Sequence, residues 1–226
     1  MHIEPGLVDG AKIVLSYATA AASLGIAAKL AADTLRESGL GALLLRSAIA
    51  TALVFSFFEL LPHAPVGVSE VHLILGSTLF LVFGAGPAAI GLALGLLIQG
   101  LFLAPFDLPQ YGMNVTTLLV PLYGVSLLAK RIIPANTPYV ELKYGQVLAL
   151  STAYQGGIVA WVAFWAIYGQ GFAASNLASI ATFGAAYMLV ILMEPLVDLG
   201  VLASAKLFRQ LQGTKLVQQR VYHAAA

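Results

Sequence analysis

Long apolar stretches separated by short polar breaks run through the chain, and they leave little choice but helices in a membrane. Of the 226 residues, 60% are hydrophobic and 9% are charged, whereas a soluble domain carries roughly 25% charged residues. About 20 apolar residues in a helix cross a hydrocarbon core. We therefore predict an all-α, polytopic membrane bundle of about seven transmembrane helices, near residues 10–31, 41–61, 69–83, 87–103, 115–133, 145–168 and 178–204.

The breaks between these stretches are compact, as in Asp33–Gly39, which predicts short loops and a single membrane domain over residues 1–226. The third and fourth stretches are short and meet at Gly84–Pro87. A helical hairpin that does not span fully on each leg is the alternative for them.

The basic residues predict the orientation, because cytoplasmic loops of membrane proteins are enriched in lysine and arginine. With seven helices, ten of the eleven basic residues fall on one side and only Lys12 falls on the other; the ten are Lys29, Arg36, Arg46, Lys130, Arg131, Lys143, Lys206, Arg209, Lys215 and Arg220. The amino terminus is then outside a cell (inner) membrane, and residues 205–226 form a cytoplasmic tail.

The chain opens with Met1-His2-Ile3-Glu4-Pro5-Gly6, which places a histidine beside the terminal amine. The Met1 amine, the His2 backbone nitrogen and the His2 imidazole can chelate one ion, and flat nitrogen-rich coordination suits Ni(II) or Cu(II), with Co(II) close behind. A basic segment and a cleavage site typical of a secretory signal are missing, so we expect Met1 to be kept. The alternative is a frayed terminus. The chain has no cysteine, so any metal needs nitrogen or oxygen donors.

The same external side gathers three of the four histidines. His72 follows Ser69-Glu70-Val71 and is predicted just inside the third helix, where an ionisable group is costly and suggests a function; a hydrogen bond to a neighbouring helix is the alternative reading. With His2 on the same face, His72 can supply a fourth nitrogen. His63, in a loop, and His223, in the tail, are expected to be solvated.

The chain resembles the substrate-binding membrane subunits (S components) of energy-coupling-factor transporters for cobalt and nickel, the CbiM/NikM family. The resemblance lies in four stretches, which are Met1-His2-Ile3 with Gly6, Val71-His72-Leu73, Leu97-Ile98-Gln99-Gly100-Leu101 and Gly112-Met113-Asn114-Val115. The chain departs from the family pattern at Phe106-Asp107-Leu108-Pro109-Gln110-Tyr111, where a Gly-Gly-Leu-Thr-Thr-Leu stretch is typical, and at Glu70.

The resemblance implies a seven-helix S component with Met1, His2 and His72 as metal ligands. It also implies cobalt(II) or nickel(II) as transported substrate and not as catalyst. The implied partners are a T-component membrane protein, ATPase subunits and, in some systems, a small accessory membrane subunit; a nucleic acid is not expected. The chain lacks a Gly-x-x-x-x-Gly-Lys-Ser/Thr phosphate loop, so ATP energy must come from other chains.

Several polar residues are candidates for supporting roles. Asn114 and Gln99, with Glu70, can hydrogen-bond a ligand and fix its ring; hydrogen bonding between helices is the alternative. Glu194 and Asp198 share a helical face, and Arg46 lies at similar depth, which predicts a buried ion pair or, alternatively, a coupling role. Small residues at Ala18, Ala21, Ala22 and Gly25 favour internal helix packing over a partner surface.

Two other classes of function remain as alternatives. A membrane-embedded metalloenzyme would use His72 with Glu70, but the chain has no His-Glu-x-x-His motif and no histidine pair at helical spacing. A self-contained metal channel would need polar residues at mid-membrane depth, whereas they concentrate near the ends of the predicted spans.

Overall fold

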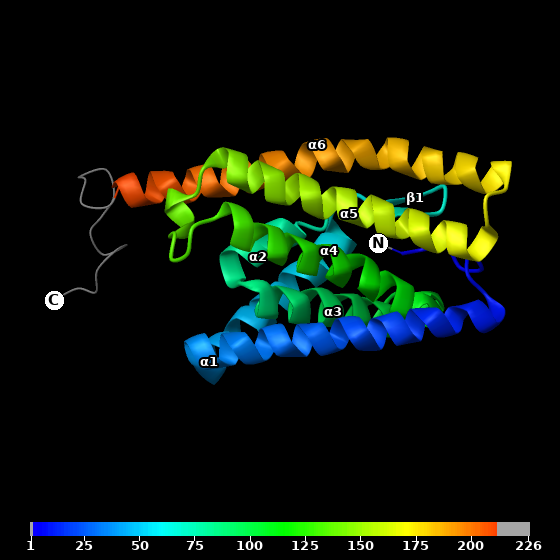
Figure 1. Cartoon of the computed structure of the whole chain (residues 1–226), viewed down its shortest axis with the longest axis horizontal. Helices are drawn as coiled ribbons and strands as arrows, with labels where there is room; N and C mark the ends of the chain where they lie inside the picture. Colours follow the sequence, from blue (N-terminus) through cyan, green and yellow to red (C-terminus); the bar gives the residue numbers. More distant parts are fainter. Residues whose placement is uncertain (1, 212–226) are drawn as a thin grey trace.

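The computed structural model of the chain describes residues 2–211, which form a bundle of long helices with one short β-hairpin (Figure 1). The helices are α1 (Ile13–Leu60), α2 (Gly76–Phe83), α3 (Ala85–Phe102), α4 (Tyr111–Ile132), α5 (Tyr144–Gln170) and α6 (Ala174–Leu211). The antiparallel strands are β1 (Ala64–Val66) and β2 (Ser69–Val71). Short 3-10 helices complete the fold: η1 (Gly10–Lys12), η2 (Pro105–Gln110) and η3 (Tyr139–Glu141).

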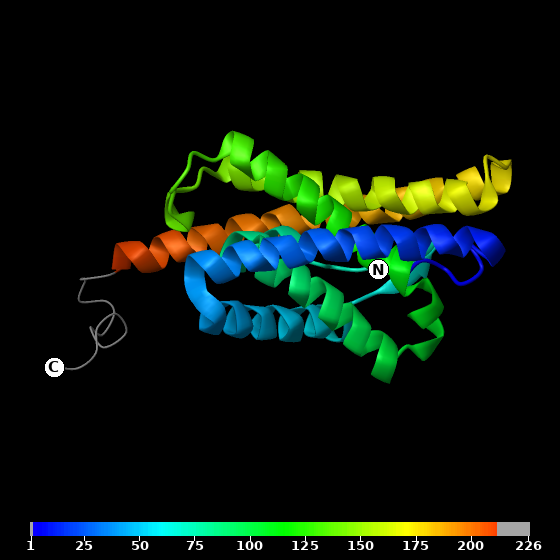
Figure 2. The same cartoon turned by 60° about the horizontal axis from the view of Figure 1, so that its bottom comes forward.

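Helix α1 contains the first two predicted spans. The polar break at Asp33–Gly39, predicted as a loop, is helical up to Gly39, whose φ of 81° and ψ of 169° interrupt the helix. Glycine adopts this left-handed φ without steric cost, and the second half of α1 folds back beside the first (Figure 2). Both predicted spans are present, joined by a sharp bend at one residue.

The third predicted helix is wrong at its start. Residues 69–71 form β2, residues 72–75 belong to neither a strand nor a helix, with Leu75 in the left-handed region at φ 55°, and helix α2 begins only at Gly76. His72 therefore lies in a link between a strand and a helix. Eight residues of α2 rise about 12 Å, far less than a hydrocarbon core of about 30 Å. The incomplete span expected for the third and fourth stretches applies to α2, whereas the 18 residues of α3 are long enough to cross.

Lys12 lies at one end of the bundle, where it donates to the carbonyl of Gly169, and most of the other basic residues that the structure describes lie toward the opposite end. The bend of α1, the connection between α4 and α5, and the carboxyl end of α6 lie at that opposite end (Figure 1). There Lys206 Nζ donates to the carbonyl of Val140 over 2.9 Å, and Arg209 pairs with Glu141 at 2.9 Å. Helix α6 continues to Leu211, past its predicted end at 204, so the predicted tail is helical in its first part.

Glycines in α3 let it approach the second half of α1 closely. A Cβ on Gly91 would lie 2.6 Å from the Cβ of Ala50 and 2.9 Å from its backbone carbon, and one on Gly95 would lie 2.6 Å from Val54 Cγ1. The two helices thus pack backbone against backbone, as small residues permit in membranes.

The small residues of the first half of α1 do not pack internally, contrary to expectation. Ala18, Ala21, Ala22 and Gly25 are exposed, and a Cβ on Gly25 would meet nothing within 4 Å. The buried face of this half carries Ser16, Ala20, Ser23 and Ala27 instead. The stripe of small residues lies about half a helical turn away from the face that packs, on the opposite side of the helix.

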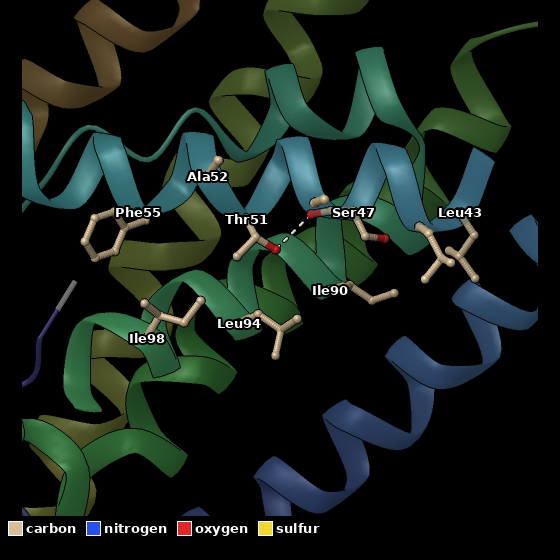
Figure 3. Close-up of a pocket in the computed structure, with 10 residues that line it drawn as sticks. Leu43, Ser47, Thr51, Ala52, Phe55, Ile90, Leu94 and Ile98 are labelled. Carbon is tan, nitrogen blue, oxygen red and sulfur yellow. Dashed lines mark hydrogen bonds between the residues drawn. The ribbon is translucent and has the colours of Figure 1, made fainter. Parts of the chain in front are cut away.

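An apolar groove of about 600 Å³ also follows the second half of α1 and α3 (Figure 3). Its walls include Phe55, Leu94 and Ile98. Thr51 also lines the groove, and its hydroxyl donates a hydrogen bond to the carbonyl of Ser47 in the same helix. None of the predicted metal ligands lines it. The groove is therefore separate from the candidate site described below.

We expect Gly91→Ala to destabilise the protein, because the added methyl group would overlap Ala50 and its backbone cannot retreat. Overpacking of this kind costs about 1–3 kcal/mol. The matched control is Gly25→Ala, at an open position, where the better helix propensity of alanine leaves stability unchanged or slightly higher. Thermal unfolding of the purified variants in detergent measures both. Equal unfolding midpoints for the two variants would contradict the close α1–α3 packing.

Candidate metal site

Residues 2 and 3 lie along the edge of β2 rather than fraying from the bundle. Ile3 bridges to Ser69, and the backbone N–H of Glu70 donates to the carbonyl of His2 over 2.9 Å. The Ser69 hydroxyl donates to the same carbonyl over 2.9 Å, and the N–H of Ile3 donates to Asn114 Oδ1 over 2.8 Å. The chain end is thus tied to the hairpin and to α4, and the frayed alternative does not describe these residues.

The pairing brings two buried imidazole rings together. The ring centroids of His2 and His72 are 5.5 Å apart, and the residues are 4% and 1% exposed. His2 Nε2 donates to Gln99 Oε1 and His72 Nε2 donates to Glu70 Oε2, each over 2.8 Å. An acceptor at each Nε2 assigns the proton to that nitrogen and leaves a lone pair on Nδ1.

Both Nδ1 atoms are buried, and neither has a hydrogen-bond partner among the described residues. A buried polar atom without a partner is costly, and a metal ion is one group that satisfies a lone pair. One ligand atom from each of His2, Glu70 and His72 lies within 4.8 Å of the others. Burial lowers the pKa of His72 to about 3, so its ring is neutral and able to coordinate near neutral pH.

Carboxylates surround the two rings. Burial alone would raise the pKa of Glu70, but its hydrogen bond with His72 contributes to a net lowering to about 2. Asp107, in η2, places Oδ2 2.9 Å from His2 Nδ1 and is 6% exposed. Burial and the charges of Glu70 and Asp107 raise the pKa of Glu4. The negative charge of this group favours a cation at the site.

A buried carboxylate on α6 holds the link that carries His72. Glu194 is fully buried, and its Oε1 accepts the backbone N–H groups of Ile74 and Leu75, the latter over 3.0 Å. Gln155 of α5 donates to Glu194 Oε2, and the Tyr187 hydroxyl donates to Gln155 Oε1 over 2.9 Å. Two helices thereby fix the backbone just after His72, which positions its ring.

The predicted ion pair between Arg46 and the α6 carboxylates is wrong. Arg46 is exposed near the bend of α1 and takes part in none of the ion pairs within residues 2–211. Asp198 instead accepts hydrogen bonds from the hydroxyls of Ser77, over 2.5 Å, and Thr78. Hydroxyl and backbone donors at the start of α2 take the place of the cation, and negative groups are favourable at that end of a helix.

Sequence reasoning missed two neighbours of His72. The ring of His63, expected to be a solvated loop residue, stacks on His72 with centroids 5.0 Å apart and planes 8° apart, although His63 itself is exposed. The ring of Phe58 packs edge-on at 5.4 Å. The hairpin brings His63 back over His72, and no sequence pattern signals that return. Asp107, which contacts His2, lies in the stretch that departs from the family pattern, and its nearness in sequence to Asn114 was the available signal.

The structure therefore brings most of the predicted site residues together, namely His2, His72, Gln99, Asn114 and Glu70. Met1 and His223 lie outside the described residues. The arrangement offers two buried imidazole rings, each with an unpartnered Nδ1, beside carboxylates, which is suited to a borderline transition-metal cation.

Comparison with known proteins agrees with this chemistry. A family model described as "CbiM: Cobalt uptake substrate-specific transmembrane region" matches residues 2–210. No curated protein sequence matches the chain at a significant level. A crystal structure of a transition metal transporter has a similar fold, with a TM-score of 0.65, 17% identity and coverage of 98% of each chain. A truncated transition metal transporter gives a TM-score of 0.63 and 18% identity, covering 93% of this chain and 98% of the other.

The two structural similarities establish the fold, and the family match covers nearly the whole described chain. Within residues 2–211, five helices are long and apolar enough to cross a membrane, in agreement with a multi-pass membrane protein. The metalloenzyme alternative is excluded by the family. The chain belongs to the CbiM family of substrate-specific transmembrane regions for cobalt uptake and is a membrane component of a metal-uptake transporter, not an enzyme.

Proposed function

We propose that the chain is the substrate-binding S component of an ATP-driven transporter that takes up cobalt(II) or nickel(II). The observation that carries the proposal is the pair of buried Nδ1 atoms of His2 and His72, both without a hydrogen-bond partner and both on residues that the fold holds in place. A self-contained channel would use a continuous polar path, whereas these donors converge on one compact point.

The ion is bound by four nitrogens, which are the Met1 amine, the His2 backbone nitrogen, His2 Nδ1 and His72 Nδ1. The amine and the backbone nitrogen close a five-membered ring with the ion, and the backbone nitrogen and Nδ1 close a six-membered ring. Binding must displace the proton of the amine, whose pKa in peptides is about 8, and also the proton of the His2 backbone amide, because an amide nitrogen coordinates a metal only when it is deprotonated. Both protons pass to the solvent, so affinity falls as the pH is lowered. The pairing of residues 2 and 3 with β2 supports an ordered terminal chelate.

Gln99, Glu70 and Asn114 orient the ligands. Gln99 and Glu70 accept the Nε2 protons of the two rings and direct both Nδ1 lone pairs inward. Asn114 holds the N–H of Ile3 and so fixes the residue after the chelate. Groups of this kind typically contribute 10- to 100-fold to metal affinity.

The membrane orientation and the partners form the rest of the proposal. The basic end of the bundle faces the cytoplasm by the positive-inside rule, so the metal site opens to the outside of the inner membrane. ATP energy comes from separate ATPase subunits through a T component, with a small accessory membrane subunit in some assemblies. The outward stripe of Ala18, Ala21, Ala22 and Gly25 on α1 suits close packing against a partner helix.

Cobalt and nickel both suit a nitrogen-rich site, and intrinsic affinity favours nickel modestly. Elemental analysis of the purified chain identifies which ion it carries.

An added residue before Met1 should abolish uptake, because it displaces the primary amine from the chelate and leaves the helices unchanged. The measurement is ATP-dependent accumulation of radioactive cobalt or nickel in proteoliposomes that contain the chain, its T component and its ATPase subunits. The unextended chain should accumulate the ion only with ATP. Uptake that persists in the extended variant would contradict the terminal chelate, and uptake without ATP or partners would favour the channel.

His72→Ala should remove metal binding, since it deletes the fourth nitrogen, whereas His63→Ala should lower affinity only modestly through loss of ring stacking. Both variants are compared with the parent by equilibrium dialysis of the metal, and their unfolding midpoints are measured as a check on folding. If His63→Ala loses the metal and His72→Ala retains it, the hairpin loop supplies the ligand instead.

Gln99→Met keeps the side-chain volume but removes the oxygen that accepts the His2 Nε2 proton. We expect the affinity for the metal to fall about 10- to 100-fold. The unfolding midpoint should fall modestly, because the buried Nε2–H of His2 loses its acceptor. The matched control is Gln146→Met, since Gln146 lies in the first turn of α5, remote from the site, and its side chain donates to the carbonyl of Ile132. Equal metal affinities in the two variants would rule out an orienting role for Gln99.

A further inference from the structure

Asp107 is buried next to the unpaired nitrogen of His2. Its Oδ2 lies 2.9 Å from His2 Nδ1, and its side chain is 6% exposed. The contact does not have the geometry of a hydrogen bond, because Nδ1 remains without a hydrogen-bond partner among the described residues. With the ring proton on Nε2, facing Gln99, two electron-rich atoms lie against each other. A cation shared by the two atoms removes this repulsion.

The separation matches that of two ligands on one ion. Donor atoms at about 2.1 Å from a metal lie about 3.0 Å apart when they subtend 90°, and about 3.4 Å apart in a tetrahedron. The observed 2.9 Å agrees with the right-angled geometry of square and octahedral complexes. Asp107 is the closer counterpart to the unpaired nitrogen, since Glu70 already uses Oε2 for the Nε2 of His72 and is 24% exposed.

The surrounding loop holds the carboxylate in place. Asp107 N–H donates to the carbonyl of Ala104 over 3.0 Å within the turn between α3 and α4. The next residue, Leu108, packs on Gly100, where a Cβ would lie 2.8 Å from Leu108 Cδ2. Helix α4 begins at Tyr111, directly after η2. Asp107 is therefore a buried residue of an ordered turn beside the site and not a surface acid.

We propose that Asp107 is a fifth, axial ligand of the transported ion and a determinant of which ion is selected. This inference rests on the proposed function. In a square of four nitrogens, the two in-plane neighbours of His2 Nδ1 are the His2 backbone nitrogen and His72 Nδ1. The remaining positions at a right angle to Nδ1 are axial, and Asp107 Oδ2 occupies one of them.

An axial oxygen changes the preference of the site. A flat set of four nitrogens suits diamagnetic, square-planar Ni(II), whereas Co(II) accepts a fifth donor readily. The carboxylate therefore makes bound Ni(II) five-coordinate and paramagnetic and raises the relative affinity for Co(II). It also cancels part of the charge of the ion in a buried site.

The test uses the purified full chain loaded with Ni(II) or Co(II), with magnetic susceptibility, visible absorption and X-ray absorption as readouts. The parent should bind Ni(II) in a five-coordinate, paramagnetic form. Asp107→Ala should give four-coordinate, diamagnetic Ni(II), and its affinity for Co(II) should fall about 10- to 100-fold, more than its affinity for Ni(II). Asp107→Asn, of equal size, separates loss of the ligand from loss of packing and should lower Co(II) affinity as well.

Asp9→Asn is the matched control, because Asp9 is an exposed acid near the same end of the chain, and it should leave spectra and affinities unchanged. Four-coordinate Ni(II) in the parent overturns the ligand role of Asp107 and leaves the proposed function intact. Equal losses of Ni(II) and Co(II) affinity in Asp107→Ala, without a change in spectrum, also overturn it. A parent chain that binds neither ion overturns the proposed function and this inference together.

Discussion

The pairing of residues 2 and 3 with the edge of β2 is the interaction on which the site depends. Backbone groups removed from water must find hydrogen-bond partners, and here the carbonyl of His2 and the N–H of Ile3 find them on β2 and Asn114. The same contacts bury the His2 ring against His72. Residues close to a terminus are normally among the most mobile in a protein, but here residues 2 and 3 form an ordered side of the candidate site.

The second constraint comes from the buried carboxylates of α6. Because α2 begins only at Gly76, residues 72–75 enter the bundle without the backbone hydrogen bonds of a helix or strand. Their N–H groups therefore need other acceptors. Glu194 accepts hydrogen bonds from two of these N–H groups, and Asp198 accepts hydrogen bonds from the two hydroxyls at the start of α2. The carboxylates thus stabilise an irregular segment within a helical bundle, and the position of His72 follows from them.

Hydropathy predicted the long helices well, since each contains an apolar run of spanning length. The prediction that His2 and His72 meet came from placing both histidines on the same external side of the membrane. Hydropathy did not predict the β-hairpin, because Ser69–Val71 runs directly into the apolar stretch that follows, and its strand character depends on pairing with β1 and with Ile3. The sequence predicted a loop at Asp33–Gly39 because this segment is polar, whereas the chain stays helical up to the bend at Gly39. The contact of Asp107 with His2 and the exposure of Arg46 depend on the direction of side chains in three dimensions, which spacing along the chain does not determine.

His72 and the amino-terminal residues of the candidate site are held in place by different kinds of contact. His72 lies between β2 and a backbone segment bound by Glu194, whereas residues 2 and 3 are held by hydrogen bonds at a strand edge and by the burial of Ile3 beside Met113 and Trp165. In the proposed chelate, the Met1 and His2 donors leave the ion together when residues 2 and 3 separate from β2, a movement that breaks these hydrogen bonds without unfolding a helix. A transport component must release its ion as well as bind it, and this separation is the release step that the proposal implies.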